Sequence, residues 1–124
     1  MANDDRQCIL IIEDDPMMLR ALGNMLKVDY NILAAKDGER GISFAKRNSP
    51  DVILLDIMMP GMTGFDVIGV LKADDETKNI PVIFLTGDDS DISKEKGYKL
   101  GAADYIEKPF VANALKERIR ACCN

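Results

Sequence analysis

Five short apolar runs recur along the chain, and each is followed by a stretch whose apolar residues keep helical spacing. The runs that we predict to be strands are Cys8–Ile12, Tyr30–Ala35, Asp51–Asp56, Pro81–Thr86 and Asp104–Lys108. The helices expected after them span about residues 16–28, 38–48, 65–73, 90–100 and 111–122. Consecutive strand–helix units form a parallel sheet with helices on both faces, because their connections are right-handed. The sequence therefore predicts an α/β fold, a doubly wound five-stranded parallel sheet with the flavodoxin-like strand order 2-1-3-4-5.

Short connections join these units and no linker divides them, so we expect a single domain over residues 1–124. No apolar run approaches the roughly 20 residues that a membrane-spanning helix needs, and the polar N-terminus does not resemble a signal peptide. The net charge of −5 argues against nucleic-acid binding by bulk electrostatics. Cys8, Cys122 and Cys123 show no paired spacing and suit a reducing compartment. We therefore expect a cytoplasmic protein without membrane insertion or direct nucleic-acid contact.

Acidic residues follow the first and third strands at the edge where open α/β sheets bind their ligands. Glu13 and Asp14 follow the first strand, and Asp56 ends the third. Asp15 precedes Pro16 and is better explained as a helix N-cap. In the predicted order these two strands are neighbours, which would bring Asp14 and Asp56 side by side. Two such charges about 4 Å apart repel by roughly 4 kcal/mol at an effective dielectric of 20, so we expect a cation to relieve them. Oxygen ligands favour Mg²⁺, with Mn²⁺ as an alternative.

Thr86 ends the fourth strand and Lys108 the fifth, so both reach the same edge. Taken singly, Thr86 is explained as a partner for a loop amide and Lys108 as a solvated surface charge. Together with a cation and carboxylates, they indicate phosphoryl chemistry. The chain has no P-loop, no dinucleotide fingerprint and no histidine, which excludes phosphohistidine chemistry within it. Asp56 remains as a nucleophile, because a carboxylate can accept a phosphoryl group.

Four segments resemble the receiver domain of two-component response regulators, in particular the chemotaxis-regulator-like receivers. They are, in chain order, "ILIIEDDP", "PDVILLDIMMPGMTG", "IPVIFLTG" and "GAADYIEKPF". The resemblance implies a phosphorelay switch that takes a phosphoryl group from a partner phosphohistidine, on a histidine kinase or histidine phosphotransfer protein. It implies no stand-alone enzyme, although such domains assist their own phosphorylation and dephosphorylation. Most response regulators carry an effector domain after the receiver, so we expect either a single-domain regulator or an excised fragment.

The resemblance also implies roles at the acidic edge. Asp56 would be the phospho-acceptor. Asp14 would bind Mg²⁺ directly, with help from Glu13 and from Asp56 itself. The backbone carbonyl of Met58 would be a further metal ligand, which leaves the Met58 side chain free to vary.

Output is expected at the fourth helix, fifth strand and fifth helix, a face that would bind a downstream protein or a second copy. By resemblance, Thr86 and Lys108 bind phosphoryl oxygens, Tyr105 is the aromatic switch residue, and the Lys108–Pro109 peptide bond is cis. Phosphorylation would draw Thr86 inward and admit the Tyr105 ring. The fourth helix has few apolar residues and contains Gly97, which costs roughly 1 kcal/mol relative to alanine. We therefore expect it to be the least firmly packed helix.

Two other classes of function compete with this interpretation. A haloacid-dehalogenase-type phosphatase also uses an aspartate at a strand end, but it places a second aspartate two residues later, where this chain has Met58. An assay on small phosphate esters would distinguish it. A pseudo-receiver that acts without phosphorylation would normally lack the acidic pair or the acceptor, and this chain keeps Glu13, Asp14 and Asp56.

Overall fold

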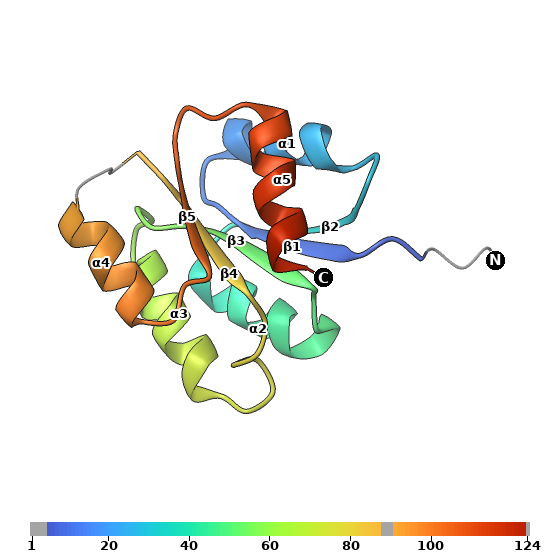
Figure 1. Ribbon diagram of the computed structural model, residues 1–124. Helices are drawn as coiled ribbons and strands as arrows, with labels where there is room; N and C mark the ends of the chain where they lie inside the picture. Colours follow the sequence, from blue (N-terminus) through green and yellow to red (C-terminus); the bar gives the residue numbers. More distant parts are fainter. Residues whose placement is uncertain (1–4, 88–90, 124) are drawn as a thin grey trace.

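The computed structural model describes residues 5–87 and 91–123, which form a parallel sheet between two layers of helices (Figure 1). The strands are β1 (Cys8–Ile12), β2 (Asn31–Ala35), β3 (Val52–Asp56), β4 (Val82–Thr86) and β5 (Asp104–Glu107). The helices are α1 (Pro16–Leu26), α2 (Gly38–Asn48), α3 (Gly64–Ala73), α4 (Asp91–Lys99) and α5 (Ala112–Cys122). The order across the sheet is β2-β1-β3-β4-β5, as predicted. The predicted ends agree closely with these bounds, although the expected start of the fourth helix at Ser90 lies outside the described residues.

The strands are apolar because both faces of the sheet are covered. In β1, Leu10 and Ile12 belong to one core, and Ile9 and Ile11 belong to the other, as the pleat of a strand requires. Helices α2, α3 and α4 lie on the Leu10 side, and α1 and α5 lie on the opposite side (Figure 1). Because all the strands are parallel, their carboxyl ends share one edge of the sheet. The polar residues that follow the strands are gathered there.

The last described residues lie at the opposite edge of the sheet from these polar residues. Each helix returns from the carboxyl edge to the edge where the strands begin, so the end of α5 lies beside the start of β1 (Figure 1). The Gln7 side chain donates a hydrogen bond to the carbonyl oxygen of Cys123 at 2.9 Å. The first and last described segments are therefore joined to each other.

Side-chain caps define the starts of three helices. Asp15 is an N-cap, as predicted, and Asp37 is a second one; each accepts a hydrogen bond from the first turn of its helix, at 3.0 Å and 2.8 Å. At α3 the Thr63 hydroxyl accepts from the Asp66 backbone N–H at 3.3 Å, and the Asp66 carboxylate accepts from the Thr63 N–H at 3.0 Å. This capping box fixes the start of α3 directly after the loop that follows Asp56.

We expect Thr63→Ala to lower the free energy of unfolding by about 1 kcal/mol, because it removes the oxygen that accepts from the first turn of α3. Thr63→Ser keeps this oxygen and serves as the control, with an expected change within about 0.5 kcal/mol. Urea unfolding of both variants measures the difference. Equal losses in the two variants would assign the effect to packing of the Thr63 methyl group instead of the cap.

The spacing of apolar residues in the sequence predicts that Val111 shares one face of the last helix with Leu115, Ile119 and Cys122, and for Val111 this prediction is wrong. Val111 is the N-cap residue, with extended backbone at φ −105° and ψ 152°, and it is 68% exposed. Helix α5 begins one residue later, so Val111 points away from the helical face. Leu115 and Ile119 are fully buried and Cys122 is half-buried, as expected for that face.

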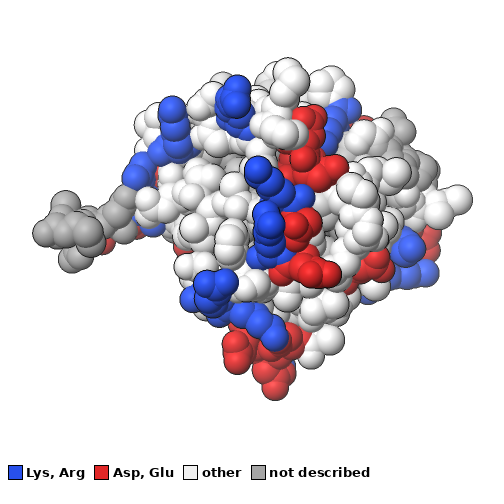
Figure 2. All heavy atoms as spheres, turned by 180° about the vertical axis from the view of Figure 1, so that it is seen from behind, with Lys and Arg blue, Asp and Glu red and all other residues white. Residues whose placement is uncertain are grey.

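The described surface carries charges of both signs. On the face seen in Figure 2, lysine and arginine side chains lie next to aspartate and glutamate side chains instead of forming a broad area of one sign. Among the helices of the described segments, none combines the length and apolar character needed to span a bilayer.

Candidate functional site

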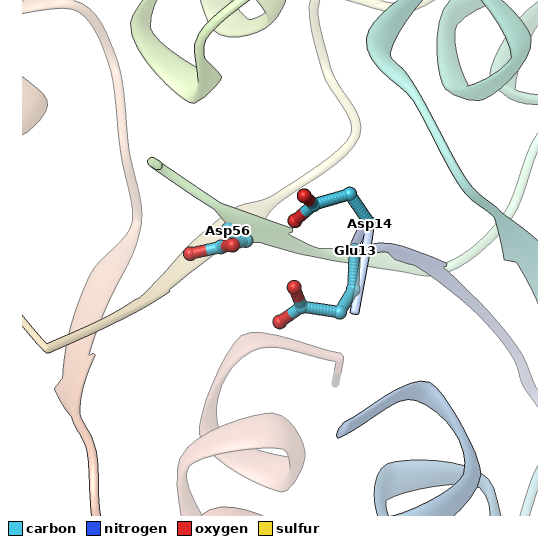
Figure 3. Close-up of side chains that lie close together, drawn as sticks. All are labelled: Glu13, Asp14 and Asp56. Carbon is cyan, nitrogen blue, oxygen red and sulfur yellow. The ribbon is translucent and has the colours of Figure 1, made fainter. Parts of the chain in front are cut away.

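Three carboxylates converge beyond the carboxyl ends of β1 and β3 (Figure 3). Glu13 and Asp14 directly follow β1, and Asp56 is the last residue of β3. The two strands pair in parallel, which brings their ends together. One oxygen of each carboxylate lies within 4.8 Å of the other two. The predicted proximity of Asp14 and Asp56 is therefore confirmed, and it follows from the strand order.

The ammonium group of Lys108 lies among these carboxylates. Its Nζ is 3.1 Å from Glu13 Oε1 and 3.6 Å from Asp56 Oδ1. The Glu13 and Asp56 side chains are only 2% and 7% exposed, so solvent screens these pairs less than it would at the surface. Lys108 is thus a member of the site, and its interpretation as a solvated charge does not hold.

Burial and neighbouring carboxyl groups raise the pKa values of Glu13 and Asp14. Burial raises the pKa of Glu13 above its ordinary value, and the neighbouring Asp56 carboxyl adds to the rise. The Asp15 backbone N–H, which donates to Glu13 Oε2 at 3.2 Å, and the Lys108 ammonium both act to lower the pKa of Glu13. Burial, followed by the Glu13 carboxyl, likewise raises the pKa of Asp14. These upward shifts mean that a second positive charge at the site would stabilise the ionised carboxylates.

The loop after Asp56 contacts the Asp56 carboxylate through its backbone. The Met58 N–H lies 3.4 Å from Asp56 Oδ1, and the Met58 side chain is 70% exposed. Gly61, at φ 77°, adopts the left-handed backbone that turns the chain toward α3. A Cβ atom at Gly64 would lie 2.5 Å from the carbonyl oxygen of Asp56. Glycine at position 64 therefore lets α3 begin in direct contact with the end of β3.

Thr86 and Lys108 are joined through the backbone where β4 and β5 end. Thr86 is fully buried, and its carbonyl oxygen accepts a hydrogen bond from the Lys108 N–H at 2.8 Å. The peptide bond between Lys108 and Pro109 is cis, as predicted. Tyr105 is 5% exposed and packs in the core, with its ring centroid 6.3 Å from that of Phe84.

The donor set fits a hard divalent cation. Carboxylate oxygens are among the ligands that Mg²⁺ prefers. Two oxygens bound to one Mg²⁺ at about 2.1 Å lie at most about 4.2 Å apart. The observed spread of up to 4.8 Å among Glu13, Asp14 and Asp56 is slightly larger, so a small side-chain rotation would bring the oxygens to coordination distance.

Sequence reasoning did not identify the role of Gly64 or the pairing of Lys108 with Glu13. The paired residues are 95 positions apart, and no local pattern reports a contact over that separation. Gly64 gave a weak signal, because glycine at the start of a predicted helix often marks a close approach of two backbone segments.

The fold and the acidic edge together define a class of protein, and comparison with known families agrees with it. The family model of the response regulator receiver domain matches residues 9–120. The chain belongs to this family, whose members are phospho-accepting switches of two-component signal transduction.

Several proteins that this chain resembles are known. Protein PilH of Pseudomonas aeruginosa is 40% identical over 114 residues, which cover 91% of this chain and 94% of PilH. Histidine kinase P4 of Formosa agariphila is 39% identical over 116 residues, or 94% of this chain, but the chain spans only 8% of that kinase. The receiver domain of the sensor histidine kinase PA1611 of P. aeruginosa superposes with a TM-score of 0.88 at 27% identity, covering 95% of this chain and 98% of that one. That structure has a magnesium ion coordinated in its active site cleft.

Proposed function

We propose that Asp56 accepts a phosphoryl group from a phosphohistidine of a partner protein. A carboxylate oxygen of Asp56 attacks phosphorus, a P–O bond forms, and the P–N bond breaks with its electron pair returning to the partner's imidazole. The observation that carries this proposal is the position of Asp56, which is buried at the ligand edge of the sheet between an acidic pair and Lys108. The whole chain, residues 1–124, would act as one receiver domain.

Lys108 and Thr86 would bind the phosphoryl oxygens. The Lys108 Nζ is already 3.6 Å from Asp56 Oδ1, so a small movement would bring it to the charge that develops on the transferred group. Thr86 ends the neighbouring strand, and its hydroxyl would donate to another oxygen. By these contacts the domain would assist its own phosphorylation and dephosphorylation, without acting as an enzyme on external substrates.

Asp14, Asp56 and the Met58 carbonyl would hold Mg²⁺, and Glu13 would assist. When bound, Mg²⁺ supplies positive charge for the carboxylates and the phosphoryl oxygens. The oxygen-only donors and the raised pKa values of Glu13 and Asp14 support this assignment. Mn²⁺ prefers similar ligands and would be expected to substitute.

A histidine kinase or histidine phosphotransfer protein would dock over the carboxylates. Three large apolar side chains, which we call the apolar rim, are exposed at this edge, one in the first turn of α1 and two in the loops. They are Met17, Met58 and Val111, with exposures of 79%, 70% and 68%. Exposed apolar groups gathered around a reactive group favour contact with a protein surface. The apolar rim therefore supports a protein donor.

Output would pass through the face formed by α4, β5 and α5. A groove of about 620 Å³ lies on this face, and its lining includes Tyr98, Tyr105, Phe110 and Arg118. Its aromatic and arginine side chains are of the kind enriched at protein interfaces. A downstream protein or a second copy of the chain would bind there, in the cytoplasm. The net charge of −5 and the interspersed charges of Figure 2 support a protein ligand over a nucleic acid.

Intact-mass measurement after incubation with acetyl phosphate and Mg²⁺ tests the function directly. We expect a gain of one phosphoryl group on the protein. Release of phosphate from small phosphate esters over many turnovers, with no gain in protein mass, would instead indicate a phosphatase.

The switch itself would involve Thr86 and Tyr105. With a beryllofluoride mimic of the phosphoryl group, we expect NMR shifts at Tyr105 and over residues 91–99, because Thr86 would move toward the mimic and let the Tyr105 ring repack. Shifts that stay within the Asp56 pocket would contradict this expectation.

A further inference from the structure

Three aromatic rings form a continuous chain across the α3 and α4 side of the sheet. Phe65, in the first turn of α3, packs edge to face on Phe84 of β4 with ring centroids 5.6 Å apart. Phe84 packs in the same manner on Tyr105 of β5 at 6.3 Å. Aromatic pairs at these separations prefer a defined relative orientation, so a tilt of one ring is transmitted to the next.

Helix α4 rests on this chain of rings through a glycine. A Cβ atom at Gly97 would lie 3.1 Å from two carbons of the Phe84 ring and 3.8 Å from Tyr105. Of the α4 residues whose side chains the structure describes, Gly97 alone is buried. The sequence interpretation of Gly97 as a mere weak point in the helix is therefore incomplete. Its missing side chain lets the helix backbone contact Phe84 directly.

Two lysines of α4 contact the outer rings. Lys96 Nζ lies 4.5 Å from the centroid of Phe65, and Lys94 Nζ lies 5.8 Å from the centroid of Tyr105. Both distances are within the range of cation–π attraction. With Gly97 over the middle ring, each ring of the chain is thus contacted by a different residue of α4.

The other end of the chain of rings lies at the acceptor. Phe65 directly follows Gly64, the residue whose Cβ position would be 2.5 Å from the Asp56 carbonyl oxygen. Phe84 also pairs with Leu55, the residue before Asp56, across β3 and β4. A displacement of the backbone at Asp56 therefore reaches Phe65 and Phe84 through atoms in contact.

We infer that the Phe65–Phe84–Tyr105 chain of rings positions α4 according to whether Asp56 is phosphorylated. The chain of rings acts on α4 through its contact with Gly97. Gly97 and Phe84 are positioning residues in this inference, which rests on the proposed phosphorylation of Asp56. This coupling passes through α3 and the middle ring. It is a second connection between the site and the output face, in addition to the movement of Thr86 and Tyr105.

Gly97→Ala tests the contact, and Gly69→Ala is its matched control. Both replace a helical glycine by alanine, but a Cβ at Gly69 meets nothing within 4 Å. The helix-propensity gain alone should shift the unfolding equilibrium by roughly four- to fivefold toward the folded state in each. Phe84→Leu provides an independent variant that removes the middle ring, and combining it with Gly97→Ala leaves room for the added methyl group. Each protein, over residues 1–124, is phosphorylated with acetyl phosphate and followed by intact mass. Amides 91–99 are then monitored by NMR with Mg²⁺ and beryllofluoride.

We expect the parent and Gly69→Ala to show the same amide response in α4. In Gly97→Ala and in Phe84→Leu, the population shift of α4 should fall by roughly 2- to 30-fold, although Asp56 still gains its phosphoryl group. The combined variant should differ from the sum of the two single variants, because the two residues are in contact. A full α4 response in both single variants would overturn the inference, as would a phosphorylated parent whose α4 does not respond. Absence of any mass gain in the parent would overturn the proposed function as well. The intact-mass measurement alone distinguishes this result from a failure of the inference about α4.

Discussion

Asp56→Asn is expected to abolish the gain of one phosphoryl group from acetyl phosphate. The amide keeps the shape of the side chain but lacks the anionic oxygen that attacks phosphorus. Loss of a nucleophile should reduce the rate of labelling by at least about 100-fold. Intact-mass spectra recorded at matched times, for parent and variant, give the ratio.

Asp75→Asn is the control for the loss of one negative charge. The Asp75 side chain is 92% exposed in the turn after α3, far from the carboxyl edge of the sheet. Its replacement should leave labelling at the level of the parent. Labelling of Asp56→Asn at the parental rate would show that another residue accepts the phosphoryl group.

Removal of Mg²⁺ with excess EDTA should slow labelling by about 100-fold or more, because the anionic phosphoryl group would approach three carboxylates whose charge Lys108 offsets in part. Asp14→Asn should raise the Mg²⁺ concentration needed for half-maximal labelling by at least about tenfold, since even outer-shell partners of a metal contribute that much. A Mg²⁺ titration of the labelling rate measures both effects.

Asp15→Asn tests whether the effect of Asp14→Asn comes from the loss of a metal ligand or from the loss of a negative charge near the metal. Asp15 caps α1 through its side chain, and asparagine caps a helix about equally well, so the fold should be retained. We expect the Mg²⁺ dependence of this variant to match the parent. If Asp15→Asn and Asp14→Asn weakened the dependence equally, bulk charge would explain the effect and the ligand assignment of Asp14 would be wrong.

The strand order and the acidic edge could be predicted because they depend on local patterns. Alternating strand and helix signals leave few topologies, and a residue that ends a parallel strand must lie at the carboxyl edge. Glu13, Asp14, Asp56 and Lys108 could therefore be assigned to one site from their positions in the sequence. The structure adds that Lys108 is held by the carboxylates themselves.

The contacts between layers could not be predicted, because they depend on how close two elements approach. Gly97 has an unfavourable propensity in a helix, and only its distance to Phe84 shows that an added Cβ atom would press on that ring. Val111 keeps the apolar spacing of α5 but lies one residue before the helix, where that spacing no longer describes its direction. Phe65 and Phe84 each suit their own element, and nothing local indicates that their rings meet.

The hydrogen bond between Gln7 and Cys123 has a consequence for how this domain can be combined with others. Both segments leave the fold at the edge remote from Asp56, so a module fused to either end would emerge from the same pole of the domain. Such a module would not obstruct the donor protein. The same domain could also be inserted between two other protein modules, because its first and last described segments lie close together. Because the fused module lies at the far edge, phosphorylation of Asp56 would affect it in one of two ways. Motions would be transmitted along the length of the sheet, or a long linker would let the module contact α4 and α5.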